Sequence, residues 1–135
     1  MPLGGKTEAM ARHAFRSTQE PPPSGPYSAA VSAGHLVFVS AQLPVDQRGA
    51  VVGGSAAEQA RRAFDALAHH LRSTGLSLDT VATVTVHLVD PADTAAVDDA
   101  FAAFFSEPRP ARTLVGVAWL PGGARLQIEA VAVRY

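Results

Sequence analysis

The sequence predicts a single α/β domain in which two helices cover one face of a mixed β-sheet. A chain of 135 residues is long enough for one domain but not for two. Hydrophobic residues make up 47% of the chain and charged residues 17%, so there are enough apolar side chains to fill a core. The apolar patterns run in the order strand, strand, strand, helix, strand, helix, strand, strand.

Three strands are expected before the first helix. Residues 13–17 predict a short strand, and a proline-rich loop over residues 21–23 follows it. Residues 27–32 and 36–41 predict two further strands, and the three residues between them predict a hairpin. Residues 36–39 are apolar on both faces, which is typical of a central strand.

The first helix is marked at both ends. Ser55-Ala-Ala-Glu58 has the form of a capping box, in which the serine caps a backbone amide and the glutamate reaches back. Gly75 stands where a C-terminal glycine belongs, so the helix is expected to run to about Thr74. One stripe of this helix is apolar: Phe64, Leu67 and Leu71.

A strand over residues 81–89 leads into the second helix. Its side chains alternate between Ala82, Val84, Val86 and Leu88 on one face and Thr83, Thr85 and His87 on the other. Asp90-Pro91 opens the helix with an N-cap and a first-turn proline, and Pro108 and Pro110 end it. The apolar stripe of this helix is Val97, Phe101, Phe104 and Phe105.

The last two strands are expected over residues 112–118 and 125–133, joined as a hairpin around residues 121–123. Two helices cover only one face of such a sheet. The other face is too apolar to lie in water, since it carries Val37 or Phe38, Val115, Val117, Val131 and Val133. A large exposed apolar face usually meets a partner, so the sequence predicts a homo-oligomer built through the open face.

Composition argues against several classes of protein. A formal net charge of −1 gives no basic excess for nucleic acid. The lack of cysteine excludes disulfides and thiolate chemistry and fits a cytoplasmic location. No apolar run approaches the length of a transmembrane helix, and residues 1–12 lack the apolar core of a signal peptide. We expect residues 1–12 to be a flexible leader and residues 13–135 to form the domain.

Several catalytic motifs are missing from the sequence. The five histidines form no HExxH motif and no i, i+4 pair, so no metal site is expected. There is no GxSxG elbow, Walker loop or GxGxxG fingerprint. The only lysine, Lys6, lies in the expected leader, which argues against Schiff-base chemistry.

Two charged residues stand inside apolar strands. Arg112 begins the segment that continues Thr-Leu-Val-Gly-Val-Ala-Trp, and Glu129 lies within Leu126-Gln-Ile-Glu-Ala-Val-Ala. Such charges are costly unless they are paired or used. Arg112 forms a salt bridge with Glu129, or points into solvent, or binds the carboxylate of a small molecule, which its planar fork suits. The residues alone leave these alternatives open.

Residues 25–135 resemble the RidA/YjgF family of reactive imine/enamine deaminases. The matching segments, in order, are Gly25-Pro26-Tyr27-Ser28, Val39-Ser40-Ala41-Gln42-Leu43-Pro44, Ala60-Arg-Arg-Ala-Phe64, Pro110-Ala-Arg112-Thr-Leu-Val-Gly-Val, Leu120-Pro121 and Ile128-Glu129-Ala-Val-Ala-Val. The resemblance implies a chorismate-mutase-like α/β domain with a six-stranded mixed sheet and two helices on one face. It also implies a homotrimer with ligand clefts between subunits.

The activity implied is hydrolytic deamination of 2-aminoacrylate-like imines and enamines to 2-oxo acids and ammonia, with no metal and no organic cofactor. Arg112 would clamp the substrate carboxylate, and Glu129 would hold or activate the attacking water. Tyr27, Ser40 and the backbone of Leu114 would line the cleft. The implied partners are a small-molecule carboxylate and copies of this chain, with no nucleic acid and no membrane.

Some positions depart from the pattern of the best-known deaminases. Leu114 replaces a cysteine, Gly116 a glutamate and Ala41 a glycine, while Asp98 aligns with an asparagine and Trp119 is unusually bulky. We therefore count Asp98 and Trp119 among the substrate-binding candidates and expect a larger, more apolar pocket. Two alternatives stay open. One is a RidA-like enzyme of a specialised pathway that cyclises, dehydrates or hydrolyses another imine or carboxylate; the other is a non-enzymatic small-molecule-binding or holdase-like protein.

Overall fold

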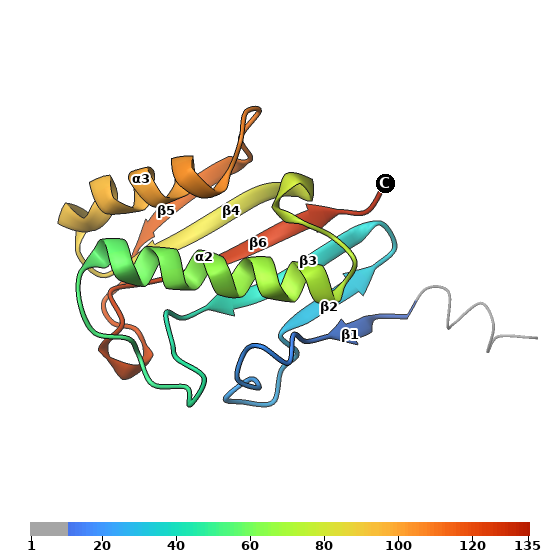
Figure 1. Cartoon of the computed structure of the whole chain (residues 1–135), viewed down its shortest axis with the longest axis horizontal. Coiled ribbons are helices and arrows are strands. Elements are labelled where there is room, and N and C mark those ends of the chain that lie inside the picture. The colour runs from blue at the N-terminus through green and yellow to red at the C-terminus, as the bar shows by residue number, and fades with distance from the viewer. Residues whose placement is uncertain (1–10) are drawn as a thin grey trace, which may run out of the picture.

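The structure, a computed structural model, describes residues 11–135 and contains one six-stranded sheet with two α-helices (Figure 1). The elements follow the predicted order: β1 (His13–Phe15), β2 (Ala30–Ala33), β3 (Leu36–Gln42), α2 (Ala56–Ser73), β4 (Val81–Leu88), α3 (Thr94–Phe104), β5 (Ala111–Gly116) and β6 (Leu126–Val133). The expected leader, residues 1–12, lies outside the described residues except for its last two.

The capping signals place α2 correctly. The Ser55 side chain accepts a hydrogen bond from the Glu58 backbone N–H, which satisfies one of the free amides of the first turn. The helix ends at Ser73, and Gly75 adopts φ +83°, the left-handed conformation that glycine reaches without steric cost. The predicted apolar stripe is fully buried: Phe64, Leu67 and Leu71.

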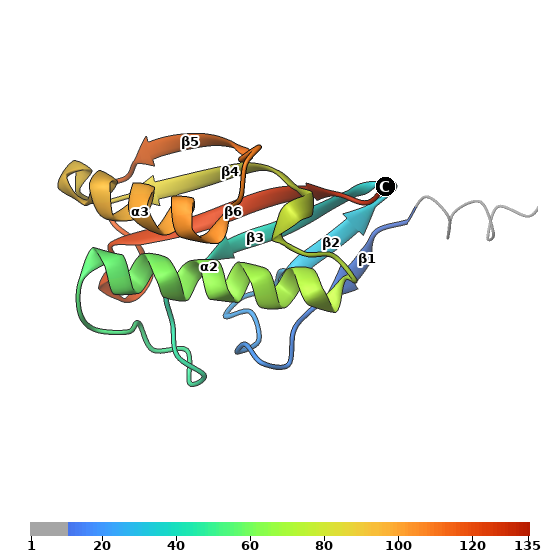
Figure 2. The same cartoon turned by 45° about the horizontal axis from the view of Figure 1, so that its top comes forward.

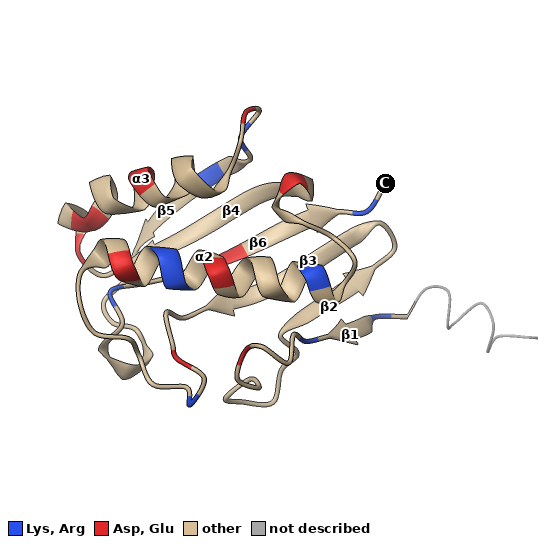
Figure 3. Cartoon of the chain, viewed as in Figure 1, with Lys and Arg blue, Asp and Glu red and all other residues tan. Residues whose placement is uncertain are grey.

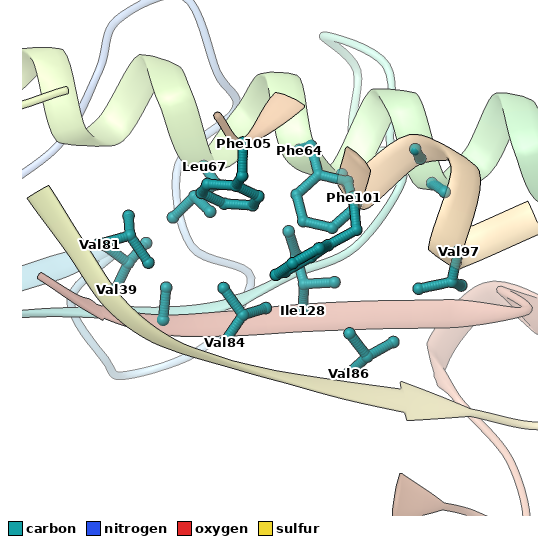
Figure 4. Close-up of a cluster of buried hydrophobic side chains, with 14 of the residues drawn as sticks. Val39, Phe64, Leu67, Val81, Val84, Val86, Val97, Phe101, Phe105 and Ile128 are labelled. Atoms are coloured by element: carbon teal, nitrogen blue, oxygen red, sulfur yellow. The ribbon is translucent and has the colours of Figure 1, made fainter. Parts of the chain in front are cut away.

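The second helix begins later than the Asp90-Pro91 signal predicts. Asp90 does accept a hydrogen bond from the Ala92 N–H, but it caps a short 3-10 turn over Pro91–Asp93, and α3 starts only at Thr94. Val97 and Phe101 of its predicted stripe are buried. Phe101, Phe104 and Phe105 surround the Phe64 ring of α2 at centroid distances of 6.2, 5.4 and 5.7 Å, so the core joins both helices to the sheet (Figure 4).

The strand alternation predicted for residues 81–89 holds except at its start. Ala82 is exposed, whereas Val81 and Val84 are both buried. The pairing with β6 skips one residue, because Val81 lies opposite Ala132 and Thr83 opposite Val131. Ala82 is therefore the extra residue of a bulge, which turns Val81 to the helix side.

The predicted C-terminal hairpin is wrong. The two strands are not neighbours: the sheet order is β1-β2-β3-β6-β4-β5, so β4 lies between β5 and β6. The chain leaves β4, crosses over through α3 and returns as β5 parallel to β4, and β6 then inserts antiparallel between β3 and β4. A β5–β6 hairpin would have placed β6 on the outer edge of β5, whereas β6 pairs instead with β3 and β4 and leaves β5 as the edge strand of the sheet. The strand predicted over residues 27–32 is also shorter, beginning at Ala30.

Both helices lie on the same face of the sheet, as predicted (Figure 2). The opposite face is open, and it carries the large side chains of Leu36, Phe38 and Val115, which are 40%, 44% and 38% exposed. Val37 is fully buried on the helix side, so Phe38 is the residue that faces outward from this part of β3. Among residues 11–135, no helix is both long and apolar enough to cross a membrane.

Candidate active site

Arg112 lies on β5, the edge strand, and its side chain points to the helix side of the sheet. It pairs in register with Val84, which is fully buried beneath the helices, and side chains at paired positions share a face. Its Nη1 lies 2.7 Å from Oδ1 of Asp98 on α3. Its guanidinium carbon lies 5.1 Å from the centre of the Phe101 ring, a cation–π contact. Its side chain keeps 23% of its surface exposed.

Asp98 is thus the charged partner of Arg112, and the alternatives of a salt bridge to Glu129 and of a fully solvent-facing arginine are both wrong. Asp98 and Phe101 are three residues apart on α3, so one face of the helix presents both to the guanidinium. Leu114, two residues further along β5, lies on the same face and packs against the hydrophobic core.

Glu129 lies on the open face of the sheet. It pairs with Thr85 of β4, one position away in register from the buried Val84, and the alternation of β6 buries Ile128 and Ala130 on the helix side. Glu129 lines a shallow depression together with Phe38, Ser40, Thr83, Thr85 and Val131. Arg112 and Glu129 therefore lie on opposite faces of one sheet, and a single chain does not bring them together.

Ser40 connects this depression to the loop that carries Tyr27, and Tyr27 itself lies at a third place. The Ser40 hydroxyl donates a hydrogen bond of 2.7 Å to the Ser28 carbonyl, so Ser40 ties β3 to the segment that carries Tyr27. Tyr27 is 52% exposed, and its hydroxyl lies 3.3 Å from the Ser24 hydroxyl. It lines a pocket between the proline-rich loop and the residues after β3, with Gln42 and His70 also in the wall.

Trp119 lies in the segment between β5 and β6 and is 71% exposed. This segment is anchored at its far end, because Arg125 donates two hydrogen bonds to Asp93, of 2.9 and 3.2 Å. The hydrogen bond from Arg125 to Asp93 raises the pKa of Arg125. The Arg125 backbone N–H also donates to Gln59 of α2.

Glu20, in the loop between β1 and β2 that also carries Tyr27 (the Tyr27 loop), forms a charged cluster with α2 that the sequence motifs did not reveal. Glu20 is buried, and its carboxylate binds Arg62 through one oxygen and His69, at 2.6 Å, through the other. Arg62 and His69 are seven residues apart on α2, a spacing that puts both on one helix face, and this was a signal for an acidic partner. Burial lowers the pKa of His70, whose Nδ1 accepts a hydrogen bond from the Ser17 backbone N–H.

Charges of both signs are spread over the helices and loops (Figure 3). Within residues 11–135, no group of three or more His, Asp or Glu side chains is placed to hold a metal ion. The candidate residues lie at four places: Arg112, Asp98 and Leu114 at the β5 edge, Glu129 and Ser40 on the open face, Tyr27 in the loop before β2, and Trp119 between β5 and β6.

Comparison with known proteins gives the family. The sequence pattern of the family described as Endoribonuclease L-PSP matches residues 17–134. The chain belongs to this family, the YjgF/RidA family. The RutC family protein of Pyrococcus abyssi is 36% identical, covering 93% of this chain and 99% of that protein. The 2-iminobutanoate/2-iminopropanoate deaminase of Capra hircus is 35% identical, covering 93% of each.

Solved structures of YjgF/RidA relatives share the fold. E. coli TdcF, crystallised with bound serine, superimposes with a TM-score of 0.85 at 32% identity, over 91% of this chain and 99% of that one. Members of the family carry names that include imine deaminase and endoribonuclease. The fold expected from the resemblance, a six-stranded mixed sheet with two helices on one face, is confirmed.

Proposed function

We propose that this YjgF/RidA protein hydrolyses imines and enamines of small 2-carboxylates to 2-oxo acids and ammonia. The observation that carries the proposal is Arg112, which stands in the segment that matches the family. Its guanidinium is held by Asp98 and Phe101 and remains partly exposed. Relatives named 2-iminobutanoate/2-iminopropanoate deaminase, which match almost the whole chain, support it. A net charge of −1, with both signs spread over the helices and loops, disfavours a polyanionic substrate such as RNA (Figure 3).

The proposed site lies between two copies of the chain in a homotrimer. Arg112 and Glu129 lie on opposite faces of one sheet, so a site that uses both needs Arg112 of one copy and Glu129 of the next. The open face supplies the apolar contact area for such an assembly through Leu36, Phe38 and Val115. Ser40, which shares the depression with Glu129, would come to the cleft with it.

The proposed reaction needs orientation and proton transfer only. Arg112 binds the substrate carboxylate, and Glu129 accepts a proton as its bound water adds to the imine carbon. The nitrogen of the carbinolamine then takes this proton back from Glu129 and also receives the proton of the new hydroxyl group. The C–N bond breaks, ammonia leaves, and the carbon keeps the water oxygen as a carbonyl. One imine and one water thus give one 2-oxo acid and one ammonia. Tyr27, Trp119 and the backbone of Leu114 would form the walls of the cleft.

The proposal is tested by following imine decay behind threonine dehydratase in competition with semicarbazide. Wild type is expected to divert the imine from semicarbazide, and Arg112→Ala to lose most of that effect. Arg109→Ala is the control for loss of an arginine, because Arg109 forms its ion pair with the exposed Glu107 and donates a hydrogen bond to the Phe105 carbonyl. If wild type leaves the decay unchanged, or if Arg112→Ala behaves as wild type, the deaminase proposal is wrong.

Mixed assemblies test the position of the site. Arg112→Ala and Glu129→Gln chains are each expected to be inactive. When they are unfolded and refolded together in equal amounts, a site is intact where an Arg112-bearing copy meets a Glu129-bearing copy, which is about a quarter of the sites in a closed ring. The mixture is therefore expected to recover about a quarter of wild-type activity. A mixture that stays inactive would contradict a site shared between copies.

A further inference from the structure

The guanidinium proposed to bind substrate already has a carboxylate against it. Asp98 Oδ1 lies 2.7 Å from Arg112 Nη1, and 52% of the Asp98 side chain is exposed. This single contact uses one end of the guanidinium, which carries five N–H donors in a planar fork. Within residues 11–135, the guanidinium of Arg112 forms this one ion pair and no side-chain hydrogen bond. The remaining donors are available to a ligand beside a fixed negative charge.

The ion pair changes which ligands the arginine attracts. An isolated guanidinium attracts any carboxylate, including a 2-oxo acid that has lost its nitrogen. Beside Asp98 the net charge is zero, so a simple monoanion gains attraction from Arg112 and loses it to repulsion by Asp98. A ligand that carries a cationic nitrogen next to its carboxylate meets both charges with opposite charges.

We propose that Arg112 and Asp98 together form a zwitterion-binding site that takes the protonated imine and discriminates against the 2-oxo acid product. This inference rests on the proposed function, which places the substrate carboxylate on Arg112. The carboxylate binds the free guanidinium donors, and the Asp98 carboxylate accepts a hydrogen bond from the substrate C=NH₂⁺ group. Hydrolysis replaces this cationic nitrogen with a neutral carbonyl oxygen, so the product faces Asp98 with an acceptor and is released.

Phe101 helps to fix the position of the guanidinium over the middle of α3. Its ring lies under the guanidinium, and Asp98 approaches from one turn earlier on the same helix, so the two residues fix the orientation of the pair. Asp99, the next residue, is also exposed but forms no ion pair with any of residues 11–135. Asp99 therefore provides a matched control of the same charge on the same helix.

Two stable probes of equal carbon skeleton separate the charge effects. Pyruvate stands for the anionic product and L-alanine for the zwitterionic substrate, and both are titrated by calorimetry into wild type, Asp98→Asn and Asp99→Asn. Wild type is expected to bind L-alanine more tightly than pyruvate. Removing one exposed charge close to a ligand charge changes affinity by about fivefold, so Asp98→Asn is expected to strengthen pyruvate binding and weaken L-alanine binding by about that factor each. Asp99→Asn is expected to leave the ratio of the two Kd values within about twofold of wild type.

Three results would overturn the inference: wild type that prefers pyruvate, wild type that does not bind L-alanine, or an unchanged ratio in Asp98→Asn. The semicarbazide assay separates these outcomes from failure of the proposed function. If imine decay responds to wild type but the Kd ratio does not respond to Asp98→Asn, only the role of Asp98 is wrong. If the ratio shifts while imine decay is unaffected, the zwitterion site stands and the deaminase proposal fails.

Discussion

Replacing Glu20 with glutamine tests whether the buried charge cluster holds the Tyr27 loop on α2. The substitution keeps the shape of the side chain and removes the negative charge that faces Arg62 and His69. Removing one member of a fully buried ion pair costs about 3–5 kcal/mol. Glu20 is only 2% exposed, but Arg62 and His69 are 20% and 24% exposed. Water therefore recovers part of the loss, and we expect a cost of about 2 kcal/mol.

Thermal and urea unfolding followed by circular dichroism measure this cost. For a chain of this length, 2 kcal/mol corresponds to a fall in Tm of about 8 °C. Glu107→Gln removes an exposed carboxylate that also pairs with an arginine, and it is expected to cost less than about 0.5 kcal/mol. If Glu20→Gln unfolds within about 2 °C of both wild type and Glu107→Gln, the cluster contributes no net stability and the reasoning is wrong.

Three further predictions concern the pH dependence of stability, the loop between β5 and β6, and the open face of the sheet. Burial lowers the pKa of His70 in the folded chain, so on acidification the unfolded chain takes up the His70 proton first. The free energy of unfolding therefore falls as pH drops below about 6.5. In urea unfolding, His70→Asn is expected to lose less stability than wild type between pH 7.5 and pH 5.5. Gly122→Ala places a Cβ 2.7 Å from Val51 at φ +65°, whereas Gly123→Ala at φ +72° meets no atom within 4 Å. Backbone strain is expected to reduce the free energy of unfolding of both variants by about 1 kcal/mol, which lowers their Tm. The contact with Val51 is expected to lower the Tm of Gly122→Ala further. Phe38→Glu is expected to convert the proposed oligomer to monomers in light scattering, because it puts a charge in the apolar contact.

Each of these predictions has a contrary result. Equal loss of stability in wild type and His70→Asn on acidification would assign the pH dependence to other groups. Equal Tm values for the two glycine variants would mean that the Val51 contact yields freely. An unchanged mass for Phe38→Glu would exclude this part of the open face from the assembly.

Local sequence signals were enough to place α2 and most strands. Ser55 and Gly75 act only on residues close to them in the chain, so both ends of α2 could be predicted from the local sequence. Ala82 shows where such signals stop. Its small apolar side chain fits the alternating pattern as well as a buried residue would, and only the pairing with β6 reveals the bulge that leaves it exposed.

Strand order was harder, because pairing partners are not encoded in a local pattern. The segment between β5 and β6 contains turn residues, which favoured a hairpin. In the structure β4 lies between these two strands and pairs with both. The same limit applied to the site. An arginine in an apolar strand predicts a partner, but the partner turned out to be Asp98, on a helix fourteen residues earlier, rather than Glu129. Neither residue type nor spacing indicates that β5 presents Arg112 to α3 while β6 presents Glu129 to the opposite face.

The insertion of β6 between β3 and β4 sets the order in which the sheet becomes complete. Without β6, β1–β2–β3 and β4–β5 would be two separate ribbons whose inner edges, β3 and β4, have unpaired backbone groups. Closing the sheet brings Leu36 opposite Val133, residues far apart in the chain, and such contacts make folding slow. Whenever β6 is unpaired, the apolar β3 edge is a template for pairing with other chains, so aggregation is expected to compete with completion of the sheet. Refolding yield should therefore fall as protein concentration rises, even under conditions in which the finished fold is stable.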